Sequence, residues 1–89
     1  MNSNENWDLF VRKDVYHKLD KFPIFDRARL IQVIESLPID PFAGDIEKME
    51  GEENTWRRRV GSYRIFFELI KTDRVIYVFD TKRRTSSTY

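Results

Sequence analysis

Residues 56–67 read WRRRVGSYRIFF, and this stretch decides the fold predicted for the chain. Two candidate β-strands flank Gly61-Ser62, and a glycine in the first position suits a two-residue β-turn. A turn of that length fixes the strand pairing, so that Val60 faces Tyr63 and Arg59 faces Arg64. Because side chains alternate between the two faces of a strand, basic and apolar residues separate onto opposite faces of this hairpin.

One face of the predicted hairpin is basic and the other is apolar. The basic face carries Arg57, Arg59, Arg64 and Phe66, and the apolar face, which is the natural core side, carries Trp56, Val60, Tyr63, Ile65, Phe67 and Leu69. Arg58 falls on the core side. Its charged end must reach the edge of the sheet, unless the turn is not two residues long.

Upstream of this stretch the apolar residues follow a helical period. Val15, Leu19 and Phe22 predict a first helix, capped by Asp14 and stopped by Pro23, and a second helix extends from about residue 26 to residue 37. Residues 7–11 form a plausible edge strand, residues 1–6 a disordered lead, and residues 38–55, with two prolines and two glycines, an irregular connection. With a last strand at residues 74–81, the order β-α-α-β-β-β predicts one α+β domain over residues 1–89. A helical hairpin then packs on one face of a small antiparallel sheet.

The formal net charge is +1, but it is unevenly distributed. Residues 1–53 hold seven Lys and Arg against twelve Asp and Glu, whereas residues 54–89 hold nine against three. This asymmetry suggests an anionic partner for the second half, although the two halves could also neutralise each other across the fold.

Several classes of chemistry are excluded by composition. Without cysteine the chain has no disulfide, no thiolate nucleophile and no Cys-based metal site. The single histidine, His17, is expected on the solvent side of the first helix, and the three glycines lack a phosphate-loop spacing. The acids of residues 45–53 lack the spacing of a calcium loop. We therefore expect no cofactor, no metal ion and no membrane span, and the polar, acidic start of the chain predicts a cytoplasmic protein.

The basic face itself points to a phosphate ligand. Arg59 and Arg64 are predicted to be direct cross-strand neighbours, and like charges about 5 Å apart repel by roughly 1–3 kcal/mol. A bound phosphate would offset this cost through bidentate hydrogen bonds to guanidinium, and Phe66 could stack on a base. Alternatively, Glu68 pairs with one arginine and the others only solubilise the sheet. The basic segment Lys82-Arg83-Arg84 is expected to converge on the same site.

The stretch at 56–67, with Lys48-Met49-Glu50-Gly51 before it, resembles the central signature of the RelE/ParE superfamily of toxins. The resemblance implies a metal-independent mRNA endoribonuclease that acts on the ribosome, in which the RNA 2′-hydroxyl attacks the adjacent phosphate. It implies catalytic roles for Arg59, Arg64, Arg83 and Tyr89 and RNA binding by Arg57 and Arg59. From their place on or beside the basic face, Phe66, Lys82 and Arg84 are expected to bind RNA as well. Its partners would be a cognate antitoxin, mRNA and the ribosome. Two alternatives stay open: a ParE-like inhibitor of DNA gyrase, and a non-catalytic homologue that acts only in a repressor complex.

Overall fold

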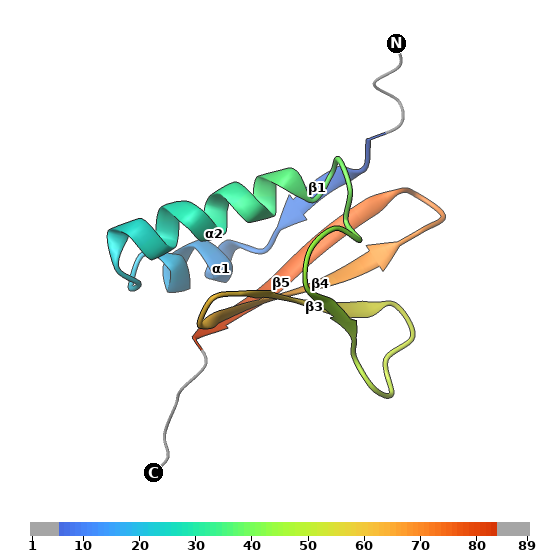
Figure 1. The fold of residues 1–89 in the computed structure, drawn as a ribbon. Helices are drawn as coiled ribbons and strands as arrows, with labels where there is room; N and C mark the ends of the chain where they lie inside the picture. Colours follow the sequence, from blue (N-terminus) through green and yellow to red (C-terminus); the bar gives the residue numbers. More distant parts are fainter. Residues whose placement is uncertain (1–5, 84–89) are drawn as a thin grey trace.

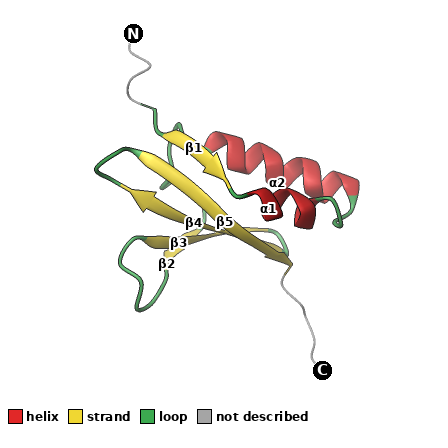
Figure 2. Cartoon of the chain, turned by 180° about the vertical axis from the view of Figure 1, so that it is seen from behind, coloured by secondary structure: helices red, strands yellow, loops and turns green. Residues whose placement is uncertain are grey.

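The computed structural model describes residues 6–83 as two helices and one five-stranded sheet. In chain order the elements are β1 (Asp8–Val11), α1 (Lys13–Leu19), α2 (Ile24–Ser36), β2 (Ile46–Lys48), β3 (Thr55–Val60), β4 (Tyr63–Ile70) and β5 (Val75–Arg83). The strands lie in the order β1-β5-β4-β3-β2. Both helices lie on the same side of the sheet (Figure 1), and the view from behind shows the same layering (Figure 2). The predicted α+β architecture is therefore confirmed.

The sheet differs from the prediction in two respects. It is mixed rather than antiparallel, because β1 pairs in parallel with β5, with Asp8 opposite Val75 and Val11 opposite Val78. The connection expected to be irregular contains β2, which pairs antiparallel with β3 and places Glu47 opposite Arg57. A strand of three residues is too short to show a period in the sequence, and its hydrogen bonds to β3 hold it in the sheet.

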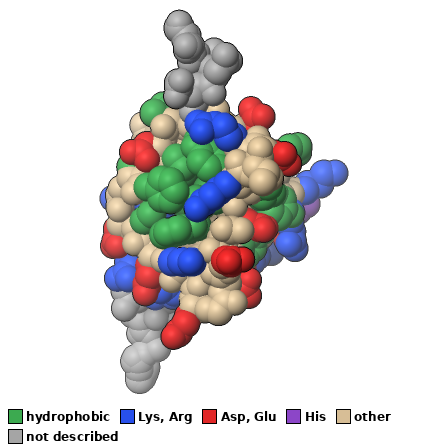
Figure 3. All heavy atoms as spheres, turned by 90° about the vertical axis from the view of Figure 1, so that its right-hand side faces the viewer, with side chains coloured by type: hydrophobic (Ala, Val, Ile, Leu, Met, Phe, Trp, Pro, Cys, Tyr) green, Lys and Arg blue, Asp and Glu red, His purple; other side chains and the backbone are tan. Residues whose placement is uncertain are grey.

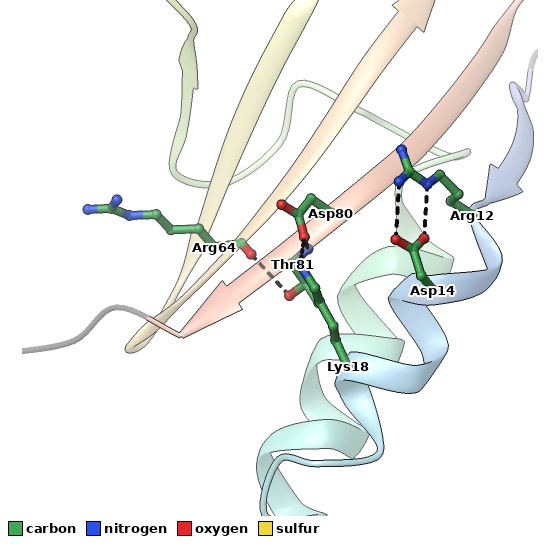
Figure 4. Close-up of polar contacts among 6 residues, drawn as sticks. All are labelled: Arg12, Asp14, Lys18, Arg64, Asp80 and Thr81. Carbon is green, nitrogen blue, oxygen red and sulfur yellow. Dashed lines mark hydrogen bonds and ion pairs between the residues drawn. The ribbon is translucent and has the colours of Figure 1, made fainter.

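The helical hairpin forms where the apolar period predicted it, but its ends differ. Asp14 does not cap α1, because the helix begins at Lys13 and the Asp14 carboxylate accepts hydrogen bonds from the Arg12 side chain at 3.0 and 3.2 Å (Figure 4). The first helix ends at Leu19, ahead of Pro23, which instead provides the N-cap of α2. His17 is exposed, as expected. The helices bury Val15, Leu19, Leu30 and Ile34 against the sheet, and Leu37, the C-cap of α2, is buried with them.

The hairpin of β3 and β4 has the predicted register. Val60 pairs with Tyr63, Arg59 with Arg64 and Arg57 with Phe66, and Gly61 has φ +59°, as the first central residue of a type II′ turn requires. The predicted apolar face becomes the core. Its fully or largely buried side chains from the sheet are Val60, Tyr63, Ile65, Phe67, Leu69, Ile76 and Val78.

A β-bulge in β5 sets which of its last side chains faces the helices. Phe67 pairs with Val78 but Phe66 pairs with Asp80, so that Phe79 is the extra residue. Beyond the bulge the alternation of faces is shifted by one residue. Thr81 is consequently buried on the core side, Lys82 lies opposite Arg64, and Arg83 lies opposite Tyr63.

The surface mixes charged and apolar side chains. On the face drawn in Figure 3, hydrophobic side chains form a patch that Lys and Arg side chains cross and border. In the part of the chain that the structure describes, neither helix has the length and apolar character needed to span a membrane. Within residues 6–83, no three His, Cys, Asp or Glu side chains are grouped so that they could hold a metal ion.

Candidate nucleic-acid interface

Four cations share the sheet face that the helices leave open. Arg57 and Arg59 come from β3, Arg64 lies opposite Arg59 on β4, and Lys82 lies opposite Arg64 on β5. We call these four residues the basic cluster. Since neighbouring strands are about 4.8 Å apart, the row Arg59–Arg64–Lys82 places three positive charges side by side across the sheet. The predicted basic face is therefore present.

Arg64 occupies the middle of this row, and a hydrogen bond to its backbone fixes its position. Its carbonyl oxygen accepts a hydrogen bond from the buried Thr81 hydroxyl at 3.1 Å, which ties β4 to β5 just beyond the bulge. Lys18 of α1 forms an ion pair with Asp80, and this pair anchors the same part of β5 to the helix. Figure 4 shows the Arg64 side chain pointing away from the helices. Its Nε is buried and has no hydrogen-bond partner.

Two carboxylates from the connection that was predicted to be irregular lie against the cluster. Glu47 of β2 forms an ion pair with Arg57, and Asp45 and Glu47 each lie 3.7 Å from Arg59. The hydrogen bond and charge of Arg57, with smaller contributions from Arg59 and Arg64, hold the pKa of Glu47 below its ordinary value. The only sequence signal for this contact was an acid-rich segment directly before an arginine run.

The acids neutralise only one side of the cluster. Glu68 was considered as a partner for an arginine, but it forms no ion pair with any of them, and it lies opposite Thr55 and Tyr77. Among residues 6–83, Arg64 and Lys82 have no carboxylate within ion-pair distance, whereas Arg57 and Arg59 do. An incoming anion therefore meets the highest uncompensated positive charge at Arg64 and Lys82.

The concavity beside β2 does not suit nucleic acid. It has a volume of ≈ 950 Å³ and is lined by Arg57 and by residues 47–53, which include four glutamates. Phosphates would be repelled there, which again directs an anion to the Arg64 side of the sheet.

Phe66 lies within the cluster but is mostly covered. The residue is 8% exposed, and the Lys82 ammonium and the Phe79 ring centroid lie 5.7 Å and 6.3 Å from the centroid of its ring. Little of this ring is left for a base. The aromatic side chains Phe10, Tyr77 and Phe79, which the sequence analysis did not single out, continue the same face toward β1.

The C-terminal residues predicted to join the cluster do not all do so. The bulge turns Arg83 to the helix side, where its guanidinium lies 5.7 Å from the centre of the Tyr63 ring. Arg84 and Tyr89 lie outside the described residues. Arg58 reaches the sheet edge as expected, where its Nη1 donates to the Ala43 carbonyl at 3.0 Å.

A buried tyrosine on the helix side is a further polar feature missed from the sequence. The Tyr63 hydroxyl donates to the Asp26 carboxylate at 2.8 Å, and burial together with this hydrogen bond raises the pKa of Tyr63. A phenol held neutral behind the sheet cannot take a proton from a ligand on the open face. Tyr63 therefore has a structural role.

A small helical hairpin packed on a five-stranded sheet with an open basic face is the fold of RelE toxins of known structure. A crystal structure of an archaeal RelE–RelB complex from Pyrococcus horikoshii matches with a TM-score of 0.80 and 24% identity, over 92% of this chain and 99% of that one. The RelB–RelE antitoxin–toxin complex from Methanococcus jannaschii matches with a TM-score of 0.71 and 26% identity, over 84% and 90%. The Methanocaldococcus jannaschii protein named "Putative toxin RelE1" is 26% identical over 88% of this chain and 90% of its own length.

The family model of the ParE toxin of type II toxin–antitoxin systems matches residues 15–87. The chain therefore belongs to this family, and the resemblance found in its sequence is confirmed.

Proposed function

We propose that the protein is an endoribonuclease that cleaves mRNA, most effectively on the ribosome, and so inhibits translation. The observation that carries the proposal is the row Arg59–Arg64–Lys82 across the open face, two members of which lack a carboxylate partner among the described residues. Such a row fits the phosphates of a single RNA strand, because guanidinium groups bind phosphate oxygens bidentately. The relatives with solved structures are RelE toxins, which supports this assignment over other phosphate ligands.

The proposed reaction needs little covalent chemistry from the protein. The RNA 2′-hydroxyl attacks the adjacent phosphorus, the bond to the 5′-oxygen breaks, and a 2′,3′-cyclic phosphate and a 5′-hydroxyl result. Negative charge grows on the phosphoryl oxygens during the attack, and the Arg64 guanidinium, fixed by its strand, would stabilise it. Arg57 and Arg59 would hold the flanking backbone in position for attack.

The described residues supply charge but no suitable general base. The carboxylate nearest the cluster is Glu47, and its lowered pKa makes it a weak proton acceptor. By its resemblance to the family, Tyr89 would take this role, and nearby cations would lower its pKa. Arg83 would assist as the resemblance implies, provided that its side chain leaves the Tyr63 ring.

The proposed partners follow from the substrate and the relatives. Two of the similar structures are complexes of a toxin with its antitoxin, and we assign this chain an antitoxin whose acidic segment would neutralise the basic cluster. Action on mRNA places the protein in the cytoplasm.

The test of the proposal is cleavage by purified protein. The protein is added to a translation mixture, and new 5′ ends on a reporter mRNA are mapped by primer extension. We expect discrete cleavage that Arg64→Ala abolishes and that Lys71→Ala, which removes an exposed cation from the β4–β5 turn, leaves intact. Cleavage by Arg64→Ala at the wild-type rate would refute the assignment.

A second candidate is inhibition of DNA gyrase, because the matching family model is that of ParE toxins. A supercoiling assay with the same protein separates the two. Loss of supercoiling without new mRNA ends would favour the gyrase function, and activity in neither assay would favour a non-catalytic role in a repressor complex with the antitoxin.

A further inference from the structure

The open sheet face carries aromatic rings beyond the basic cluster. In β5, Ile76 and Val78 are fully buried in the core, so Tyr77 projects from the opposite, open face. The ring of the bulge residue Phe79 lies on the same face, against Phe66 and Tyr77. In β1, Phe10 pairs with Tyr77, and its neighbours Leu9 and Val11 pack against the core. Phe10 therefore stands on the open face, where it is 63% exposed. We call Phe10, Tyr77 and Phe79 the aromatic strip.

The strip is continuous with the basic cluster. The Tyr77 and Phe79 rings are 6.4 Å apart with an interplanar angle of 30°, and Phe79 lies 6.3 Å from Phe66. Phe66 in turn lies beneath Lys82. The path from Arg64 to the level of Tyr77 covers four residues of β4, which is about 14 Å at ~3.4 Å per residue. A ligand of a few nucleotides can therefore contact both.

We infer that the aromatic strip is a base-stacking platform for single-stranded RNA, on which the bases next to the phosphate held at Arg64 and Lys82 are seated. Aromatic rings on a flat sheet bind unstacked bases in a sequence-tolerant manner, while cations beside them hold the backbone. The charges beside the strip favour this occupant. The cations at the end of the strip attract a polyanion, and the rings can stack with flat apolar groups on the same molecule. The inference rests on the proposed function, since it extends the RNA site from the phosphate to the bases.

The test is RNA binding by the full chain, measured by fluorescence anisotropy. The probe is a labelled single-stranded RNA of about ten nucleotides, made with 2′-O-methyl groups so that it cannot be cleaved. The variants Tyr77→Leu and Phe79→Leu remove one ring each and keep an apolar side chain. Phe25→Leu is the matched control, because Phe25 is 86% exposed on α2, away from the open face. Thermal unfolding of each variant identifies any loss of folding.

We expect each strip variant to bind the probe roughly 10-fold more weakly, as loss of one stacked base implies. The dependence of affinity on salt should stay that of the wild type, because no phosphate contact is lost. Arg64→Ala should reduce the salt dependence instead, and a double-stranded RNA should compete poorly because its bases are already stacked.

The remaining outcomes separate the two proposals. If Arg64→Ala weakens binding while the strip variants and Phe25→Leu bind like the wild type, the stacking inference is wrong and the proposed function stands. Wild-type affinity for RNA in the strip variants, with a weakened complex with the antitoxin, would assign the strip to protein recognition. A wild-type protein that does not bind the probe would overturn the stacking inference, whereas the proposed function is decided separately by cleavage in the translation mixture.

Discussion

Replacing Arg64 by methionine should make the protein more stable and inactive. The register places Arg64 directly opposite Arg59, and two unit charges about 5 Å apart repel by roughly 1–3 kcal/mol between the dielectric limits of water and a protein surface. Asp45 and Glu47, both 3.7 Å from Arg59, offset part of this repulsion. The buried Nε of Arg64 has no partner, which adds a desolvation cost of about 1 kcal/mol. Methionine keeps most of the apolar stem, so we expect a net gain of about 1 kcal/mol in the free energy of unfolding.

Thermal unfolding measures this gain. For a domain of this size, 1 kcal/mol raises Tm by about 4–8 °C. The gain should shrink from ~0.1 M to ~1 M salt, because the screening length falls from about 10 Å to about 3 Å. Lys71→Met removes the same charge from an exposed turn and should change Tm little. RNA cleavage by Arg64→Met should fall at least ~100-fold if the guanidinium stabilises the transition state. A variant that is less stable than the wild type at low salt, or that cleaves RNA undiminished, would refute the reasoning.

Three further predictions concern Glu47, Tyr63 and Gly44. Glu47→Gln should raise the affinity for RNA, because it removes the ion-pair partner of Arg57. In the wild type, the lowered pKa of Glu47 keeps this ion pair intact through mildly acidic pH, and the pair is lost only as the pH falls below the ordinary range of a glutamate. A titration of RNA binding against pH measures this loss. Tyr63→Phe should cost about 1–2 kcal/mol of stability by leaving Asp26 without its donor. Because the pKa of Tyr63 is raised, this contact stabilises the wild-type protein below pH ~10, and the stabilisation is lost as the pH rises through the pKa of Tyr63 in the folded protein. Ultraviolet absorbance should show that Tyr63 ionises at a higher pH than an ordinary tyrosine. Gly44→Ala should lower Tm, because Gly44 has φ +83° and a Cβ there would lie 2.4 Å from Cζ of Arg58. The Arg58 side chain would have to move, and its hydrogen bond to the Ala43 carbonyl would be lost.

The sequence predicted the hairpin and its basic face because both depend on local rules. A two-residue turn at Gly61-Ser62 fixes the register, and alternation then assigns each side chain to a face. The helices were likewise predicted from their apolar period, but the start of the first helix was not, because Asp14 pairs with the Arg12 side chain instead of capping the helix.

The features that escaped prediction depend on pairings between distant segments. The parallel pairing of β1 with β5 joins the two ends of the domain, and β2 gains its strand conformation from β3 alone. The bulge at Phe79 has no local sequence signature, yet it places Lys82 on the open face where uninterrupted alternation would have placed Arg83. A site assembled from residues on both sides of such a bulge cannot be assigned from alternation.

The two faces of the sheet satisfy their polar groups to different degrees, and this difference argues for a ligand. On the helix side, Tyr63 bonds to Asp26 and Thr81 to the Arg64 carbonyl. On the open side, Arg64 faces a like charge and has no carboxylate partner among residues 6–83, and the same face carries the 63% exposed Phe10 and the half-buried Tyr77 and Phe79. A face kept only for solubility would alternate and pair its charges, and would not need exposed rings. One single-stranded RNA would satisfy all three features together, because its phosphates neutralise the cations and its bases cover the rings.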